Sequence, residues 1–219
     1  MPTISAENYL KAIYHLQRHH PKVKTKAIAE QLNVSQPSVS SMLQSLAASG
    51  LVEHQPYKGT SLTVAGTKEA LMVIRKHRLI EMFLVETLGY AWDEVHEEAE
   101  QLEHSVSDLL AQRIDEFLGS PQFDPHGDPI PTADGQIFHR DAMPLSEARA
   151  SQSVRVTRVL DQQPDVLRHL TKLGLTPQAE IVIVEVLPFD GQMTLQIGAD
   201  EATVSRALAS RLLVTPLEA

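Results

Sequence analysis

Residues 25 to 64 constrain the fold of this chain more than any other segment, because their pattern predicts two short helices followed at once by a hairpin. Thr25 can cap the first helix, which ends near Asn33. Ser35 can cap the second, with Pro37 tolerated in its first turn. The second helix carries one buried stripe, formed by Val39, Met42, Leu43 and Leu46. The segment therefore predicts helix, turn, helix and hairpin in that order.

The hairpin is predicted from two short strand patterns, Leu51–His54 and Ser61–Val64, with Pro56, Tyr57, Lys58 and Gly59 supplying the turn. When a helix-turn-helix is followed by a hairpin, the second helix lies in the DNA major groove and the hairpin reaches the flanking backbone. The sequence therefore predicts a winged helix-turn-helix.

The distribution of charge favours DNA as the partner of this segment. Residues 1–66 hold six Lys and Arg against three acids, whereas the remainder holds 13 basic and 25 acidic residues, which gives the whole chain its net charge of -9. A basic head suits phosphate, although domains of this shape also bind proteins. The candidate DNA contacts are mostly uncharged donors and acceptors, which suit phosphate and modest base contacts. They are Lys24, Lys26, Ser35, Gln36, Pro37, Ser38, Ser40, Ser41, Gln44 and Lys58.

The chain contains no cysteine, which excludes disulfides and thiolate chemistry. It has no apolar run of the roughly 18 residues that a membrane span needs, and its start lacks the order of a signal peptide. We expect a soluble, cytoplasmic protein with no membrane partner.

Beyond the hairpin the pattern first stays helical and then changes to short strands. Long amphipathic patterns cover Gly66–Leu88 and Trp92–Leu118, and Ser120–Ser151 is rich in Pro, Gly and Asp. Brief strand patterns from Ser153 to the end suggest a small barrel. The predicted fold is mainly α with a small β domain.

The stretch VHEEAEQLEH, residues 95–104, is the strongest candidate for chemistry. On one helix His96, Glu100, Glu103 and His104 share an arc of about a quarter turn at the border of the buried side. Taken alone, it is as well explained by a solvated acidic face as by a metal site. A second pair, His77 and Glu81, spaced one turn apart on the preceding helix, favours a metal. Without sulfur, such ligands suit manganese, iron or zinc.

Four segments together resemble the diphtheria-toxin-repressor family of metal-dependent transcriptional regulators. They are TKAIAEQLNVSQPSVSSMLQSLAASGLVEH, RKHRLIEMFL, VHEEAEQLEH and DPHGDPIP. The C-terminal TKLGLTPQAEIVIVEV also looks like the SH3-like barrel of that family. The resemblance implies a winged-helix domain over 1–70, a helical metal-binding and dimerisation domain over 71–140 and an SH3-like (FeoA-like) domain over 150–219. It also implies a homodimer, for which Leu109, Leu110, Ile114, Phe117 and Leu118 offer an apolar surface or simply core.

The resemblance also implies two metal positions. Carried over residue by residue, the activating position uses Asn8, Glu100, Glu103 and His104. The ancillary position uses His77, Glu81 and His96, with further ligands expected at Asp124, Gln162 and Asp165. Glu100 stands where iron-type members carry cysteine, which favours Mn²⁺ over the alternative, Fe²⁺. Asn8 departs from the family in being neither methionine nor aspartate.

The implied function is a repressor of metal-uptake genes that binds an inverted-repeat operator when a divalent metal is present. Three other functions compete with it. A metallohydrolase would use Glu97 or Glu98 as its base, but the sequence has no His-Glu-x-x-His motif. A winged-helix regulator of an organic ligand would leave the carboxylates solvated, and a metal-storage protein would not need the basic head. The other histidines are expected at the surface or in packing: His15, His19, His20, His54, His126, His139 and His169.

Overall fold

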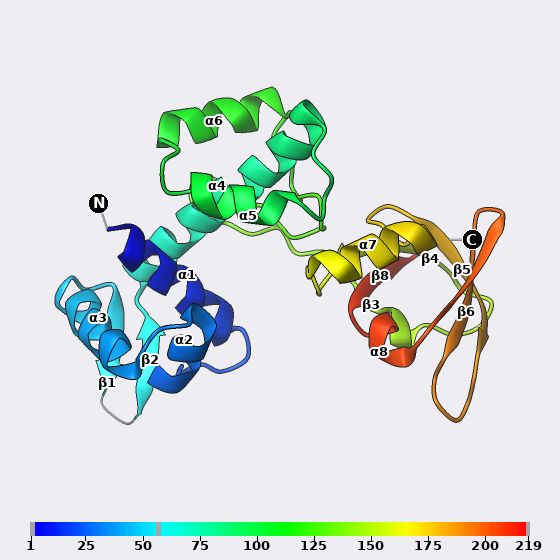
Figure 1. Ribbon diagram of the computed structural model, residues 1–219, viewed down its shortest axis with the longest axis horizontal. Helices are drawn as coiled ribbons and strands as arrows, with labels where there is room; N and C mark the ends of the chain where they lie inside the picture. Colours follow the sequence, from blue (N-terminus) through cyan, green and yellow to red (C-terminus); the bar gives the residue numbers. More distant parts are fainter. Residues whose placement is uncertain (1–2, 56–57, 218–219) are drawn as a thin grey trace. The chain divides into compact units, whose positions relative to one another are not determined.

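The computed structural model describes residues 3–55 and 58–217, which fold into two compact units (Figure 1). The first unit runs to His77 and also contains Glu100–Ala111 and Pro131–Ile137. The second contains Arg78–Ala99, Gln112–Ile130 and the chain from Phe138 onward. None of the described helices is both long enough and apolar enough to cross a membrane.

The first unit begins with three helices, α1 (Ile4–Gln17), α2 (Thr25–Leu32) and α3 (Gln36–Ala48). Ser35 caps α3, because its side chain accepts a hydrogen bond from the amide of Ser38, and Pro37 lies in the first turn. Asn33 ends α2 in the left-handed conformation, with φ of 51°. The buried side chains that hold the helices together include Leu10, Ile13, Ile28, Val39, Leu43 and Leu46.

Strands β1 (Val52–Gln55) and β2 (Gly59–Leu62) follow as an antiparallel hairpin, so the predicted helix-turn-helix and wing are both present. The second strand ends earlier than predicted: Val64 starts a helix, because the hydroxyl of Thr63 caps it by accepting a hydrogen bond from the amide of Gly66 at 3.1 Å. Of the predicted turn residues, Pro56 and Tyr57 lie outside the described residues.

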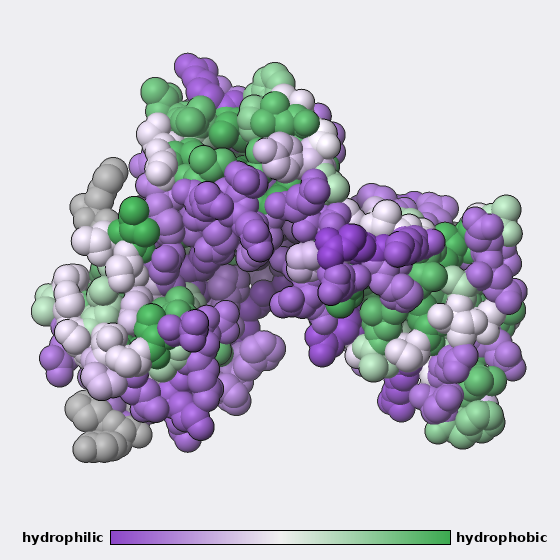
Figure 2. All heavy atoms as spheres, in the orientation of Figure 1, coloured by the Kyte–Doolittle hydropathy of each residue, from purple (hydrophilic) through white to green (hydrophobic). Residues whose placement is uncertain are grey.

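The helical middle of the chain contains α4 (Val64–Leu88), α5 (Val95–Leu102) and α6 (Asp108–Phe117). The prediction of one helix over Trp92–Leu118 was wrong. Ser107 breaks it, since its hydroxyl accepts a hydrogen bond from the amide of Leu110 and so caps α6. Glu103 and His104 therefore lie in a turn that follows α5, instead of on one helical face. Figure 2 shows hydrophobic surface in the region of α6, where Phe117 is 69% exposed.

The C-terminal part of the second unit is one antiparallel sheet with the strand order β3-β8-β4-β5-β6-β7. The strands are β3 (Met143–Pro144), β4 (Ser153–Val159), β5 (Glu180–Val186), β6 (Met193–Ile197), β7 (Asp200–Val204) and β8 (Leu212–Pro216). The short helical segments are η1 (Leu145–Glu147), α7 (Pro164–Leu173) and α8 (Arg206–Ala209). The core of this sheet includes Val154, Val156, Leu167, Leu170, Ile183, Leu195 and Val214.

This sheet is open, so the expectation of a closed barrel needs correction. Within residues 138–217 its two edge strands, β3 and β7, do not pair with each other. Strand β3 has only two residues, and its Pro144 has no amide hydrogen to donate. The sequence reading also missed helix α7, which starts at Pro164, ends at the left-handed Gly174 and buries Leu167 and Leu170.

Candidate metal centres and DNA surface

The first candidate metal centre lies in the first unit and is formed by His77, Glu100 and Glu103, here named the Glu103 cluster. One ligand atom from each of these residues lies within 4.8 Å of the other two. Helix α4 supplies His77, the end of α5 supplies Glu100 and the turn after α5 supplies Glu103. Nδ1 of His77 is 2.7 Å from Glu103 Oε2 and 3.8 Å from Glu100 Oε1. The structure thus brings His77 to the residues predicted for the activating position.

The carboxylate of Glu103 has no solvent-accessible surface, so its charge needs a partner inside the protein. Lys11 of α1 supplies one, donating to Glu103 Oε1 at 2.8 Å and to Oε2 at 2.9 Å. The same ammonium donates to Glu100 Oε1 at 2.6 Å. A single positive group therefore bridges both carboxylates of the Glu103 cluster.

A further predicted ligand, His104, borders this cluster, and Asn8 lies three residues before Lys11 on α1. His104 Nδ1 is 2.6 Å from Glu7 Oε2, which joins the turn after α5 to α1. Its other ring nitrogen, Nε2, is buried and makes no hydrogen bond within the described chain, although it comes within 3.2 Å of Glu103 Oε1. The side-chain oxygen of Asn8 is also buried without a hydrogen-bond partner in residues 3–55 and 58–217.

These residues fit a divalent cation. Buried polar atoms are normally hydrogen-bonded, so the unpaired Asn8 oxygen on α1 and the unpaired His104 nitrogen beside Glu103 are donors that a metal would satisfy. The donor set contains only oxygen and nitrogen. Asn8, Glu100, Glu103 and His104 therefore fit the activating position expected from the sequence, with His77 as an additional candidate ligand.

The second candidate metal centre lies in the second unit and is formed by Glu81, Asp124 and His126, here named the Asp124 cluster. All three are buried, and their ligand atoms lie within 4.8 Å of one another. Nδ1 of His126 is 3.9 Å from a carboxylate oxygen of each acid and has no hydrogen-bond partner in the described residues. Its other nitrogen, Nε2, is 2.8 Å from the carbonyl oxygen of Trp92, which fixes the ring.

A tight loop in the Pro-rich connection positions Asp124 and His126. Oδ1 of Asp124 accepts hydrogen bonds from the amides of His126 and Asp128, at 2.8 and 2.9 Å. Gly127 has φ of 86°, and a Cβ atom there would lie 2.0 Å from the carbonyl oxygen of Thr157 in β4. Only glycine allows this approach. The carbonyl of His126 also accepts from the amide of Val159, so the loop is fixed to β4.

Burial raises the pKa of Asp124 well above its usual value, and the neighbouring carboxylates of Asp128 and Glu81 raise it further. Arg78 opposes this shift in pKa, since its Nε lies 3.6 Å from Asp124 Oδ2. A nearby cation would favour the ionised form of Asp124 and so oppose this rise in pKa. The loop therefore also fits a divalent metal.

The remaining predicted ligands divide into near and distant ones. His96 is half exposed, with Nδ1 3.5 Å from Glu81 Oε1. Gln162 donates to Asp128 at 2.7 Å, and Arg158 also pairs with Asp128, so Gln162 borders the Asp124 cluster. Asp165 lies outside it, because its side chain is 96% exposed and pairs with Arg168. Residue 165 lies in the first turn of α7.

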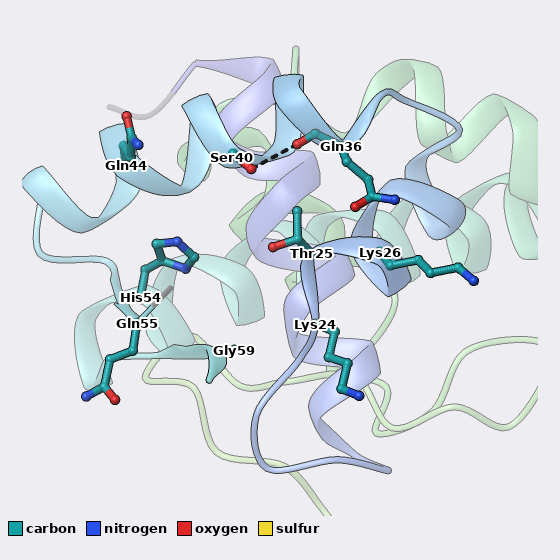
Figure 3. Close-up of a pocket in the computed structure, with 9 residues that line it drawn as sticks. All are labelled: Lys24, Thr25, Lys26, Gln36, Ser40, Gln44, His54, Gln55 and Gly59. Atoms are coloured by element: carbon teal, nitrogen blue, oxygen red, sulfur yellow. Dashed lines mark hydrogen bonds between the residues drawn. The ribbon is translucent and has the colours of Figure 1, made fainter. Parts of the chain in front are cut away.

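The candidate DNA surface is a hollow of about 460 Å³ between α2, α3 and the wing (Figure 3). Its lining is Lys24, Thr25, Lys26, Gln36, Ser40, Gln44, His54, Gln55 and Gly59. Gln36, Ser40 and Gln44 come from α3, and the two lysines flank Thr25 at the start of α2. Five of the predicted contacts thus meet in one place. The predicted Pro37, Ser38, Ser41 and Lys58 are exposed but outside the lining, and Ser35 serves as the α3 cap.

Several residues at these sites were not predicted from the sequence. Lys11 and Glu7 contact segments about ninety positions away, which helical periodicity cannot reveal. The available signal was that Lys11 lies three residues after Asn8 and hence on the same side of α1. His126 was expected at the surface or in packing and not as a ligand; it is fully buried and lies with Glu81 and Asp124.

The fold and these sites define a winged-helix DNA-binding protein with candidate divalent-metal centres. Three family models match successive parts of the chain: the iron dependent repressor N-terminal DNA binding domain (residues 1–60), the iron dependent repressor metal binding and dimerisation domain (residues 63–132) and the FeoA domain (residues 143–216).

The diphtheria toxin repressor of Corynebacterium glutamicum is 31% identical to this chain and covers 82% of it, with 83% of that protein matched. The iron-dependent repressor IdeR of Mycobacterium leprae is 28% identical, with 96% of each chain covered. A solved manganese-dependent transcriptional repressor in complex with manganese is 40% identical, with a TM-score of 0.85, and covers 97% of this chain and 100% of that one. This chain belongs to the family of iron-dependent and diphtheria-toxin repressors. It is a metal-dependent, DNA-binding transcriptional repressor with a dimerisation domain, and not an enzyme.

Proposed function

We propose that this repressor is activated by Mn²⁺ and controls metal-uptake genes by binding an inverted-repeat operator as a homodimer. The observation that carries the proposal is the Glu103 cluster, in which a carboxylate pair and an imidazole converge without any sulfur ligand. Hard oxygen ligands suit Mn²⁺, because they give no advantage to metals that prefer sulfur. The 40% identity to a repressor solved with manganese supports the same ion.

Iron(II) is the second candidate activator, and a specific observation favours it. The relative from Mycobacterium leprae, which matches 96% of this chain, is an iron-dependent repressor. Fe²⁺ binds nitrogen and oxygen sites somewhat more tightly than Mn²⁺ in the general affinity order of divalent metals, so ligand chemistry alone does not reject it. The experiment below therefore compares the two ions directly.

The proposed activation uses ligands from two elements of the first unit. A bound divalent ion supplies two positive charges at the carboxylates of the Glu103 cluster. Asn8 projects from α1, the helix that packs in the core of the winged helix-turn-helix, whereas Glu103 and His104 project from the turn after α5. Shared coordination holds α1 against that turn and lowers the negative charge of the unit that meets phosphate. DNA must then tighten metal binding by the same factor by which metal tightens DNA binding.

We assign the second centre to Glu81, Asp124 and His126, with His96 and Gln162 at its border. Because the cluster is buried and its loop is fixed to β4, its role in the proposal is to stabilise the second unit. The division of the chain into domains 1–70, 71–140 and 150–219 belongs to the same proposal. So does a dimer surface on α6, where Leu109 and Phe117 are exposed and Ile114 is instead buried.

The test is a DNA-binding titration of the full chain on an inverted-repeat promoter fragment, with Mn²⁺, Fe²⁺, Zn²⁺ or a chelator in parallel. We expect Mn²⁺ to tighten operator binding at the lowest free-ion concentration, and the chelator to reverse it. Glu100→Ala and His104→Ala should abolish this stimulation while their circular dichroism stays unchanged. Equal DNA binding in metal and chelator would overturn metal activation, and a lower threshold for Fe²⁺ would replace manganese with iron.

A further inference from the structure

We propose that Lys11 is a built-in competitor of the activating metal, an inference that rests on the metal site proposed above. Its ammonium group donates to the carboxylates of Glu100 and Glu103 and has to leave them when a divalent cation binds. The lysine thereby sets the metal concentration at which the repressor switches on.

The contacts of Lys11 are those expected of a stand-in cation. Its Nζ donates to three carboxylate oxygens, at 2.6, 2.8 and 2.9 Å, from two residues that lie about ninety positions further along the chain. These oxygens include both Glu103 oxygens and the Glu100 oxygen that lies 3.8 Å from His77 Nδ1. An ammonium has three hydrogens to donate, and all three are directed at the candidate ligands.

Burial makes this arrangement more than a surface ion pair. The side chain of Glu103 is fully buried and that of Lys11 is only 14% exposed, so the carboxylate would be uncompensated without a cation beside it. Exposed pairs of this kind contribute little, whereas a buried carboxylate that loses its partner destabilises the fold. The lysine therefore keeps the metal-free cluster folded and its carboxylates close together.

The same contacts prevent Lys11 from remaining in place when a metal binds. A metal bound by Glu100 and Glu103 uses the oxygen lone pairs that now accept from Nζ, and it brings two positive charges to within a few ångströms of the ammonium. The two cations repel each other, and the buried position of Glu103 and Lys11 reduces screening by solvent. Lysine is suited to leave, because its flexible four-carbon chain can swing the ammonium toward solvent.

Amine labelling of the unmodified full chain tests this exchange directly. The protein is treated briefly with an amine-reactive reagent, with and without Mn²⁺, and the label on each lysine is quantified by mass spectrometry. We expect labelling of Lys11 to rise several-fold when Mn²⁺ is added. Lys76, which pairs with the exposed Asp108 at 2.8 Å in the same unit, is the internal control and should not change. Unchanged or reduced labelling of Lys11 at saturating Mn²⁺ would overturn the proposal.

Lys11→Gln removes the competing charge and keeps most of the side-chain volume. Calorimetric titration with Mn²⁺ alone should show affinity raised on the order of tenfold, since one close charge repulsion is removed. The metal-free variant should melt at lower temperature, and Mn²⁺ should raise its melting temperature more than in the unmodified protein. Lys76→Gln is the matched control and should leave both quantities unchanged.

Lys11→Arg keeps the charge and provides the second variant in case Lys11→Gln does not fold. We expect its Mn²⁺ affinity to be equal to or below that of the unmodified protein. Equal affinity in all three proteins, or weaker binding in Lys11→Gln, would show that Lys11 does not compete. Calorimetry measures Mn²⁺ affinity and labelling measures the reactivity of Lys11, and neither experiment contains DNA. Their outcomes are therefore independent of the operator titration. If metal bound as described but did not affect DNA binding, the activation mechanism would fail while this competition stood.

Discussion

The two candidate metal centres solve the problem of buried carboxylates in different ways. In the Glu103 cluster a flexible lysine compensates the charge and Glu100 remains 38% exposed. In the Asp124 cluster the acid is compensated by backbone amides and by Arg78, within a loop fixed to β4, and burial keeps its pKa high. The first arrangement is one in which a cation is already present and can be exchanged. The second is a preformed site that lacks enough positive charge.

This difference indicates which of the two centres is suited to respond to metal concentration. A site that exchanges one cation for another changes its contacts to α1, and so to the winged helix-turn-helix, when metal arrives. A site that is buried and rigid changes its net charge but has little room to change its geometry. We therefore expect metal concentration to be sensed by the Glu103 cluster, and stability to be provided by the Asp124 cluster.

The largest effect is expected from Glu103→Gln, which removes the buried carboxylate shared by Lys11 and His77. Mn²⁺ affinity should fall at least about 100-fold, as for the loss of a principal ligand, and the metal-free protein should lose about 2 kcal/mol of stability. Calorimetry and thermal unfolding measure these two quantities. Glu97→Gln, at an exposed position of the preceding helix α5, is the control and should be close to the parent. A normal Mn²⁺ affinity in Glu103→Gln would remove the distinction between the clusters.

A smaller effect, in the opposite direction, is expected from Asn8→Asp. The buried and unpaired Asn8 oxygen becomes part of a carboxylate, so Mn²⁺ affinity should rise about tenfold through one added charge. The added negative charge should also lower the melting temperature of the metal-free protein. Asn33→Asp at the end of α2 serves as the control. If Asn8→Asp did not alter Mn²⁺ affinity, Asn8 would not be a ligand.

Asp124→Asn distinguishes the two clusters, because it should raise the stability of the protein whereas Glu103→Gln should lower it. The raised pKa means that ionised Asp124 destabilises the metal-free fold at neutral pH, so the neutral amide should stabilise it by about 1 kcal/mol. Its oxygen can still accept both loop hydrogen bonds. The same neutralisation at Glu103 has the opposite sign, because that charge is compensated.

The pH dependence of Asp124→Asn follows from the same direction of shift. A carboxyl group whose folded pKa lies above its unfolded pKa gives stability that is complete below the unfolded value and is lost as pH rises through the folded value. The parent and the variant should therefore unfold alike in acid and diverge as the pH increases toward neutrality. Urea unfolding in chelator at several pH values measures this. A parent that is more stable than Asp124→Asn at neutral pH would contradict the proposed charge imbalance.

The smallest effect is expected from Lys26→Ala, which lies in the DNA hollow and outside both clusters. Loss of one phosphate contact should weaken operator binding about fivefold and reduce the salt slope by about one. Mn²⁺ affinity in the absence of DNA should be unchanged. Lys68→Ala, an exposed lysine of α4 outside the hollow, is the control. A change in metal affinity in Lys26→Ala would mean that metal and DNA surfaces overlap.

The sequence was informative where function follows local periodicity. The helix-turn-helix and the hairpin follow from spacing and caps over a few residues. The break at Ser107 was missed, because the apolar period continues across it while a single hydroxyl caps the next helix. Lys11 and His126 were missed for a different reason: their roles depend on residues brought together only by tertiary folding. Sequence periodicity places Lys11 on the side of α1 that carries Asn8, but it does not reveal which distant residues Lys11 contacts.

The glycine at position 127 has a consequence for the sheet that follows it. The loop presses against β4 at Thr157, where the register between β4 and β8 shifts, and the neighbouring carbonyl of His126 holds the amide of Val159. A bend of β4 at this point would displace the backbone that carries Asp124 and His126, because Gly127 lies directly against Thr157 and His126 is hydrogen-bonded to Val159. The sheet of the C-terminal domain is therefore mechanically coupled to Asp124 and His126, and a deformation of the sheet would change the distance between these two side chains.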